Sequence, residues 1–150
     1  MTGVAVPTTD NRDERLLAAL AHALILINFV GAVGAAVIFA LNRERSRYVA
    51  FQAAQAAVYQ LAGFLLTVGC WVCWTVGYLG SLVPLMADPS AYPEPPWFFW
   101  AGMASMVLPL AFMGLLWLYG LWGAVQAFRG RPFRYLLIGP WLGHYLLDQG

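Results

Sequence analysis

"LLAALAHALILINFVGAVGAAVIFALNRERSR", residues 16–47, combines the two features that decide the fold: a long uncharged run and, directly after it, a cluster of arginines. About 20 apolar residues are needed to cross the roughly 30 Å hydrocarbon layer of a bilayer. The run from Leu16 to Asn42 is long enough for this, and it is too long for the apolar region of a signal peptide. We therefore interpret it as a retained membrane-spanning helix.

Two further uncharged runs follow, over residues 48–87 and 95–128. The chain is 61% hydrophobic and 10% charged, whereas about a quarter of the residues in a soluble domain are charged. We predict an all-α integral membrane protein with three transmembrane helices, a fourth being possible, plus cytoplasmic amphipathic segments. The predicted parts are a polar N-terminal tail (1–15), a three-span membrane domain (16–128) and a cytoplasmic amphipathic or re-entrant segment (129–150). Pro109 predicts a kink in the third span.

The arginines predict the orientation, because the loop between the second and third spans holds two acids and no base. Positive residues favour the cytoplasmic side, so this side and its lipid headgroups receive two clusters: Arg43, Arg45 and Arg47, and Arg129, Arg131 and Arg134. Three spans then place the N-terminus outside, although Arg12 and Arg15 favour the opposite. We predict a multi-pass protein of the bacterial cytoplasmic membrane. A net charge of +1 argues against a nucleic-acid partner.

A polar stripe opens the second run, since Tyr48, Gln52, Gln55 and Tyr59 fall on one helical face. An amide facing hydrocarbon without a partner costs several kcal/mol. We therefore expect Gln55 and Tyr59 to hydrogen-bond to another helix. Two interpretations stay open: residues 46–57 lie at the cytoplasmic membrane surface or project from it, with the span beginning near Tyr59, or the stripe is a specific recognition groove.

The first run adds three candidate helix-packing residues, His22, Asn28 and Gly31. Gly31 belongs to a set of closely spaced small residues that permits close approach of helices. A histidine near the end of a span most often donates a hydrogen bond to another helix, and the alternative is a ligand for haem or chlorophyll. His144 is interpreted as a membrane-interface residue.

Catalytic chemistry has little support in the sequence. Cys70 and Cys73 have C-x-x-C spacing, but in the middle of a span we interpret them as small buried apolar residues. No carboxylate lies within a run, so a proton relay lacks its usual component. We expect no enzymatic activity, no metal site and no cofactor.

Several short motifs resemble those of a known family. "LAALAHAL", "SRYVAFQAAQAAVYQL" and "GAVQAFRGRPFRY" are similar to segments of the small bacterial membrane proteins related to the Tic-twenty subunit of the chloroplast import translocon. The matching residues are His22, Ser46, Val49, Gln55, Ala56, Ala127, Gly130 and Tyr135. The chain departs from the pattern at Gln52 and Leu136. The resemblance implies a helical membrane fold and no established activity.

Three functions remain open from the sequence. The first is an accessory or assembly subunit that packs against a larger membrane complex or forms a homo-oligomer within the lipid bilayer. The second is a component of a protein-translocation or channel assembly, as the resemblance implies. The third and weakest is a haem- or chlorophyll-binding subunit that uses His22.

Overall fold

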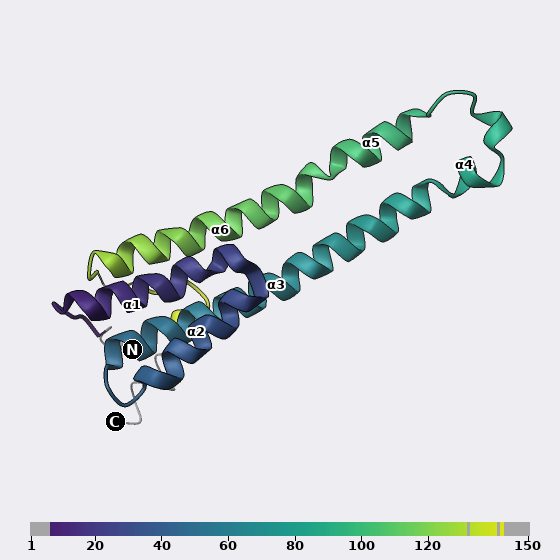
Figure 1. The fold of residues 1–150 in the computed structure, drawn as a ribbon. Coiled ribbons are helices and arrows are strands. Elements are labelled where there is room, and N and C mark those ends of the chain that lie inside the picture. Colours follow the sequence, from purple (N-terminus) through teal and green to yellow (C-terminus); the bar gives the residue numbers. More distant parts are fainter. Residues whose placement is uncertain (1–6, 132, 141, 143–150) are drawn as a thin grey trace. The chain divides into compact units, whose positions relative to one another are not determined.

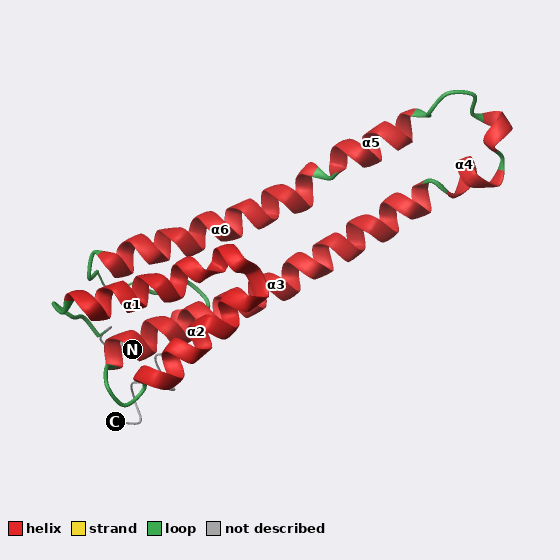
Figure 2. Ribbon diagram, viewed as in Figure 1, coloured by secondary structure: helices red, strands yellow, loops and turns green. Residues whose placement is uncertain are grey.

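The computed structural model describes residues 7–131, 133–140 and 142, which form helices joined by short turns (Figures 1 and 2). None of these described residues lies in a strand. In chain order the elements are α1 (Arg12–Ala23), η1 (Leu24–Ile27), α2 (Asn28–Asn42), α3 (Arg47–Ser81), α4 (Val83–Ala87), η2 (Pro89–Ala91), α5 (Trp97–Ser105) and α6 (Val107–Phe128). The all-helical prediction is confirmed.

Three helical segments are long and apolar enough to cross a membrane: Arg12–Asn42, Arg47–Ser81 and Trp97–Phe128. The first consists of α1, η1 and α2, the second is α3, and the third consists of α5 and α6. These are the three runs that the sequence predicted. The chain is therefore a multi-pass membrane protein.

The first segment is bent back on itself. Helix α1 begins after Asn11, whose side-chain oxygen accepts a hydrogen bond from the backbone N–H of Asp13 at 2.9 Å, the usual bond of a helix N-cap. At Asn28 the backbone has φ 51° and ψ −127°, a conformation that asparagine tolerates better than most residues. Helix α2 then returns alongside α1 (Figure 1). The first segment is thus a helical hairpin.

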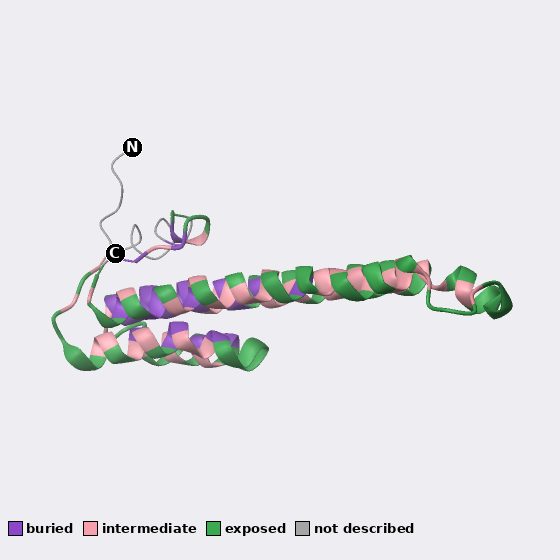
Figure 3. Ribbon diagram, turned by 90° about the horizontal axis from the view of Figure 1, so that it is seen from above, coloured by how far each residue is buried: buried purple, intermediate pink, exposed green. Residues whose placement is uncertain are grey.

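The chain divides into two compact units: unit 1 is residues 1–64 with 116–150, and unit 2 is residues 65–115. The buried residues of unit 1 concentrate on the first half of α3 and on the helices around it (Figure 3). Small side chains allow this close packing, with Ala21, Ala35, Ala53 and Ala56 forming one buried cluster between α1, α2 and α3.

Residues 48–56 pack inside unit 1, and the position of residues 46–57 at the cytoplasmic membrane surface, or projecting from it, stays a prediction. Every residue from Tyr48 to Ala56 is buried. One side of this stretch packs on α1 and α6, where Val49 meets Ala18 and Ala127. Another side packs on the chain after α6, where Phe51 meets Leu142. The polar face and the apolar face of this stretch are therefore both covered by protein, and neither face meets water.

Unit 2 contains the second half of α3, the connection through α4 and η2, helix α5 and the start of α6. Most of its apolar side chains are exposed, as expected for helices that face lipid. The third segment is interrupted at Met106, because Pro109 has no N–H to donate to the carbonyl of Ser105. In the connecting loop, a hydrogen bond from Ser90 lowers the pKa of Asp88.

Candidate functional site: a buried polar network

The imidazole of His22 is the centre of a hydrogen-bond network inside unit 1. Its Nδ1 lies 3.0 Å from the hydroxyl of Tyr135, its Nε2 lies 3.1 Å from Oε1 of Gln52, and the side chain is fully buried. The amide nitrogen of Gln52 donates to the carbonyl of Phe133 at 3.2 Å, so its oxygen is the group that faces His22. Nε2 must therefore carry the proton, and Tyr135 donates to Nδ1.

Two glutamines of α3 hold the chain that follows α6. Gln52 and Gln55 stand one turn apart, and both amide nitrogens donate to the carbonyl of Phe133, at 3.2 and 3.3 Å. Oε1 of Gln55 accepts the backbone N–H of Tyr135 at 3.1 Å. The backbone of residues 133–135 thus finds its partners on side chains of a helix. Burying these amide groups without such bonds would cost free energy. The glutamine side chains and the backbone of residues 133–135 therefore satisfy each other's hydrogen-bonding groups.

Tyr59 extends the network into an aromatic cluster. Its ring stacks on that of Tyr135 with centroids 4.1 Å apart and planes 11° apart. Its hydroxyl donates to the carbonyl of Leu116 on α6 at 3.0 Å. Tyr135 lies outside the membrane-spanning segments and is 2% exposed. Burial, and secondarily the neighbouring Tyr59 and Tyr119, raise the pKa of Tyr135 well above its usual value.

Two glycines leave room for these contacts. A Cβ on Gly123 would lie 2.8 Å from the ring of Phe133 and 3.2 Å from both Nδ1 of His22 and the hydroxyl of Tyr135. A Cβ on Gly31 would overlap the backbone carbonyl of Leu24 and would lie 2.8 Å from Oε1 of Gln60. Helix α6 can approach the network, and α2 can approach η1, only because these positions have no side chain.

The structure brings together most of the polar residues that the sequence singled out. His22, Gln52, Gln55 and Tyr59 belong to one connected cluster. Asn28 does not join them: it is exposed at the hairpin reversal, and its role in partner contact or helix packing stays a prediction. Asn28 serves the turn, where its backbone adopts a positive φ.

The six arginines predicted to contact lipid headgroups fall into two groups. Five of them are exposed: Arg43, Arg45, Arg47, Arg129 and Arg131. Arg134 is half-buried, and its guanidinium carbon lies 5.8 Å from the ring centre of Phe51, within the range of a cation–π contact. Headgroup contact stays a prediction for all six.

Sequence reasoning missed three members of the site: Phe133, Tyr135 as a buried group, and Gln60. The amide nitrogen of Gln60 donates to the carbonyl of Ala21 at 2.7 Å. The available signal was the alternation of aromatic and charged residues at Phe133, Arg134 and Tyr135. A period of two is typical of an extended chain with one buried face. His144, interpreted above as an interface residue, lies outside the described residues.

A comparison with protein families identifies the chain's relatives. Residues 13–142 match the magnetosome magnetite crystal formation protein family, MamF/MmsF. The chain belongs to this family. The matched range contains every residue of the network, from His22 to Tyr135. No curated protein and no solved structure matches the chain.

Membership of the MamF/MmsF family corrects the resemblance to Tic-twenty-like proteins, which is wrong. The motifs that supported it are short, and alanine, glycine and glutamine recur in them. Such residues recur wherever transmembrane helices pack closely and pair their amides. The departures from the Tic-twenty-like pattern at Gln52 and Leu136 argued against the resemblance. Gln52 in particular has a role of its own in this chain, since it bonds His22.

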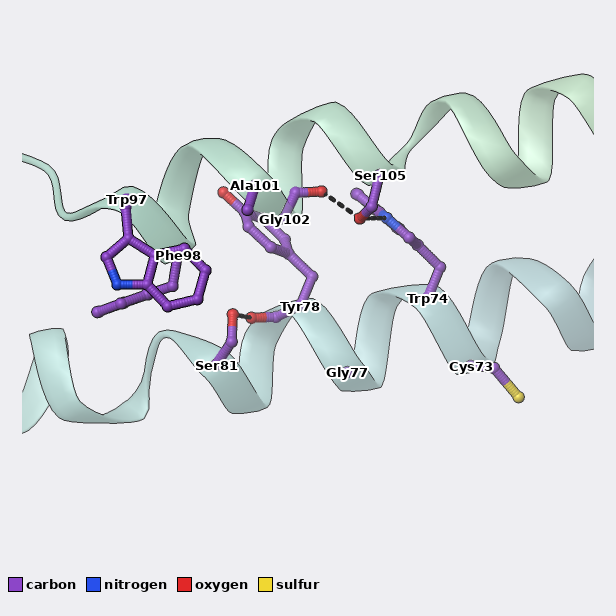
Figure 4. A pocket seen from close by; sticks show the side chains of 10 residues that line it. All are labelled: Cys73, Trp74, Gly77, Tyr78, Ser81, Trp97, Phe98, Ala101, Gly102 and Ser105. Atoms are coloured by element: carbon purple, nitrogen blue, oxygen red, sulfur yellow. Dashed lines mark hydrogen bonds between the residues drawn. The ribbon is translucent and has the colours of Figure 1, made fainter.

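Unit 2 of this MamF/MmsF family member has a hollow of about 340 Å³ between α3 and α5 (Figure 4). The indole N–H of Trp74 donates to the hydroxyl of Ser105 at 3.0 Å, and this hydroxyl donates to the carbonyl of Gly102 at 2.7 Å. No charged side chain is among the ten that line the hollow. Most of the lining side chains are apolar or aromatic, so the hollow presents a largely apolar, aromatic surface.

The cysteines were expected to be buried, and this is wrong. Cys73 is exposed and Cys70 is half-exposed, and both are free thiols. In Figure 4 the sulfur of Cys73 points away from α5. Within residues 7–131, 133–140 and 142, no three side chains of His, Cys, Asp or Glu come together in a way that could hold a metal ion.

Proposed function

We propose that this chain is a non-enzymatic accessory protein of a magnetosome membrane and takes part in magnetite crystal formation. The observation that carries the proposal is the family match over residues 13–142. This range includes the buried network and all but the first residue of the three long apolar segments.

The geometry of the network supports a structural role. Both ring nitrogens of His22 are engaged, by Gln52 and by Tyr135. The amide groups of Gln52 and Gln55 are likewise engaged on both their oxygen and their nitrogen. A general acid or base needs a proton position within reach of a substrate. In His22, Gln52 and Gln55 both side-chain polar atoms already have a partner from the same chain.

The same bonds bear on the two other functions considered from the sequence. A haem iron or chlorophyll magnesium would need a lone pair on His22, and Tyr135 donates to the one that the ring offers. The translocation hypothesis depended on the Tic-twenty resemblance, which the family match replaces. The accessory role is the one that the residues favour.

The accessory role includes contact with other membrane subunits or with further copies of this chain. Large apolar side chains of unit 2 are exposed, among them Leu65, Val76 and Trp100. They offer a surface to lipid and to neighbouring helices alike. Cross-linking in intact membranes, followed by mass measurement, tests for such neighbours.

The experiment that tests the function is complementation. The full chain is expressed in a magnetite-forming bacterium that lacks its own member of this family, and crystal dimensions are measured by electron microscopy. We expect crystal size to return toward that of the parent strain. The chain carrying Gly31→Ala, which disturbs the hairpin, is the impaired variant, and Gly69→Ala, whose added Cβ meets nothing within 4 Å, is the matched control.

Fractionation of the same cells tests the localisation. The proposal requires the protein in the magnetosome membrane, whereas the prediction from the sequence was the bacterial cytoplasmic membrane. Crystals that stay at the size of the deletion strain, although the intact protein is present in the magnetosome membrane, would refute the proposed function.

A further inference from the structure

The reversal at Asn28 determines where both ends of the first segment lie. Helices α1 and α2 run in opposite directions side by side (Figure 1). The close approach of Gly31 to the carbonyl of Leu24 joins the two arms just beyond the turn. The start of α1 and the end of α2 therefore lie at the same end of the hairpin.

Two hydrogen bonds and one short loop place this end of the hairpin beside the start of α3 and the end of α6. Nε of Arg15 donates to the carbonyl of Phe128 at 2.9 Å, which joins the start of α1 to the end of α6. The hydroxyl of Tyr48 donates to the carbonyl of Ala127 at 3.0 Å, which joins the start of α3 to the end of α6. Helix α2 reaches α3 through a loop of only four residues, 43–46. All these ends meet within unit 1.

The basic residues of the chain share this location. The sequence has eight arginines and no lysine, and all eight lie in or next to the helix ends just described: Arg12, Arg15, Arg43, Arg45, Arg47, Arg129, Arg131 and Arg134. The sequence-based topology had put the first two on the opposite side of the membrane from the other six. The hairpin removes that conflict with the positive-inside rule.

The lengths of the arms agree with a segment that enters the membrane and returns. Helix α1 has 12 residues and α2 has 15, which correspond to about 18 Å and about 22 Å at 1.5 Å per residue. Neither arm crosses a hydrocarbon layer roughly 30 Å thick. Helix α3, with 35 residues, is about 52 Å long and crosses it easily.

One side of the hairpin turn is covered by protein, while Leu26, Ile27 and Asn28 are exposed. Non-helical backbone is tolerated at membrane depth only when protein or water covers it. Gln60 of α3 donates to the carbonyl of Ala21 near the end of α1 at 2.7 Å. Ile25, within the turn itself, is 6% exposed and packs against Gly120 of α6.

We propose that Arg12–Asn42 is a re-entrant helical hairpin that enters and leaves the membrane on the arginine-bearing side. Only α3 and the α5–α6 segment then cross the membrane. The N-terminus, the loop at residues 43–46 and the end of α6 share one side, and the exposed arginines, Arg12, Arg43, Arg45, Arg47, Arg129 and Arg131, meet the anionic headgroups of one leaflet. The loop at residues 88–96 lies on the other side.

Labelling from one side of the membrane tests this topology. In a variant with Cys70→Ala and Cys73→Ala, single cysteines replace three exposed residues in turn: Thr8, Glu44 and Ser90. Sealed vesicles of known orientation are treated with a membrane-impermeant maleimide. We expect Thr8→Cys and Glu44→Cys to react from the same side and Ser90→Cys only from the opposite side. Reaction of Thr8→Cys from the side of Ser90→Cys, or of all three from one side, would overturn the proposal.

A second measurement does not depend on the cysteine variants. Green fluorescent protein, which becomes fluorescent only on the cytoplasmic side, is fused to the N-terminus or to the C-terminus of the unmodified chain. The hairpin predicts fluorescence from both fusions. A dark N-terminal fusion that is present in full in the membrane, together with a fluorescent C-terminal fusion, would show that the first segment crosses.

Discussion

Replacement of Gly31 by alanine is the sharpest test of the hairpin. The added Cβ would overlap the carbonyl oxygen of Leu24 and would lie 2.6 Å from its carbonyl carbon. These are backbone atoms, so no side-chain rotation relieves the overlap. The two arms must separate, and Gln60, whose Oε1 would lie 2.8 Å from the new methyl group, must move as well.

Overpacking of this kind typically costs about 1–3 kcal/mol, and contact with backbone places Gly31→Ala near the upper value. For a chain of this size, 1 kcal/mol corresponds to roughly 2–4 °C in Tm. We therefore expect Gly31→Ala to lower the Tm of the detergent-purified protein by roughly 6–12 °C, measured by loss of the monodisperse peak after heating.

Two other glycines provide graded controls. A Cβ on Gly34 would lie 2.8 Å from the terminal methyl group of Leu24, which can rotate away, so Gly34→Ala should lower the Tm less. A Cβ on Gly69 meets nothing within 4 Å, so Gly69→Ala should leave the Tm unchanged or raise it. If Gly31→Ala melts at the temperature of Gly69→Ala, the close approach of α1 and α2 is not present in the protein.

Three further predictions concern the network and the cysteines. Gln52→Leu leaves the Nε2 proton of His22 without its acceptor, so we expect the free energy of unfolding to fall by about 1–3 kcal/mol in denaturant titrations; an unchanged midpoint would contradict the bond. The pKa of Tyr135 is raised in the folded protein, so the contribution of this hydroxyl to stability is complete below about pH 10 and is lost as the pH rises toward the folded pKa. In thermal melts above about pH 10, Tyr135→Phe should therefore lose stability less steeply than the parent protein. Parallel stability profiles of the two proteins would refute this. Since Cys70 and Cys73 are free and at least partly exposed, their joint replacement by alanine should shift the Tm by no more than about 2 °C, the effect of roughly 0.5 kcal/mol expected at a surface position.

The sequence was sufficient for the membrane class and for the three apolar segments, because hydropathy and length decide both. It was also sufficient to select His22, Gln52, Gln55 and Tyr59 as polar groups that need protein partners, since unpaired amides are costly in hydrocarbon. It was not sufficient to say which partners these would be. One of these partners is the backbone carbonyl of Phe133. Because nearly every residue has the same backbone carbonyl, the residue type does not show which one accepts the bond.

The reversal at Asn28 was out of reach for a related reason. Hydropathy reads Leu16–Asn42 as one run, because a turn built from leucine, isoleucine and one asparagine is as apolar as a helix. The conflict between Arg12 with Arg15 and the other six arginines was the available signal. The hydrogen bond between Arg15 at the start of α1 and Phe128 at the end of α6 resolves this conflict, and only the structure shows it.

The central claim of this account is that the polar stripe of α3 is satisfied inside its own chain, with His22 between Gln52 and Tyr135. The ¹⁵N spectrum of the histidine-labelled protein at neutral pH measures this directly. Because the chain has two histidines, a His144→Gln variant assigns the signals of His22. The account predicts a neutral ring that is protonated on Nε2 and accepts a hydrogen bond at Nδ1. A ring protonated on Nδ1 alone, a doubly protonated ring, or two tautomers in rapid exchange would contradict it.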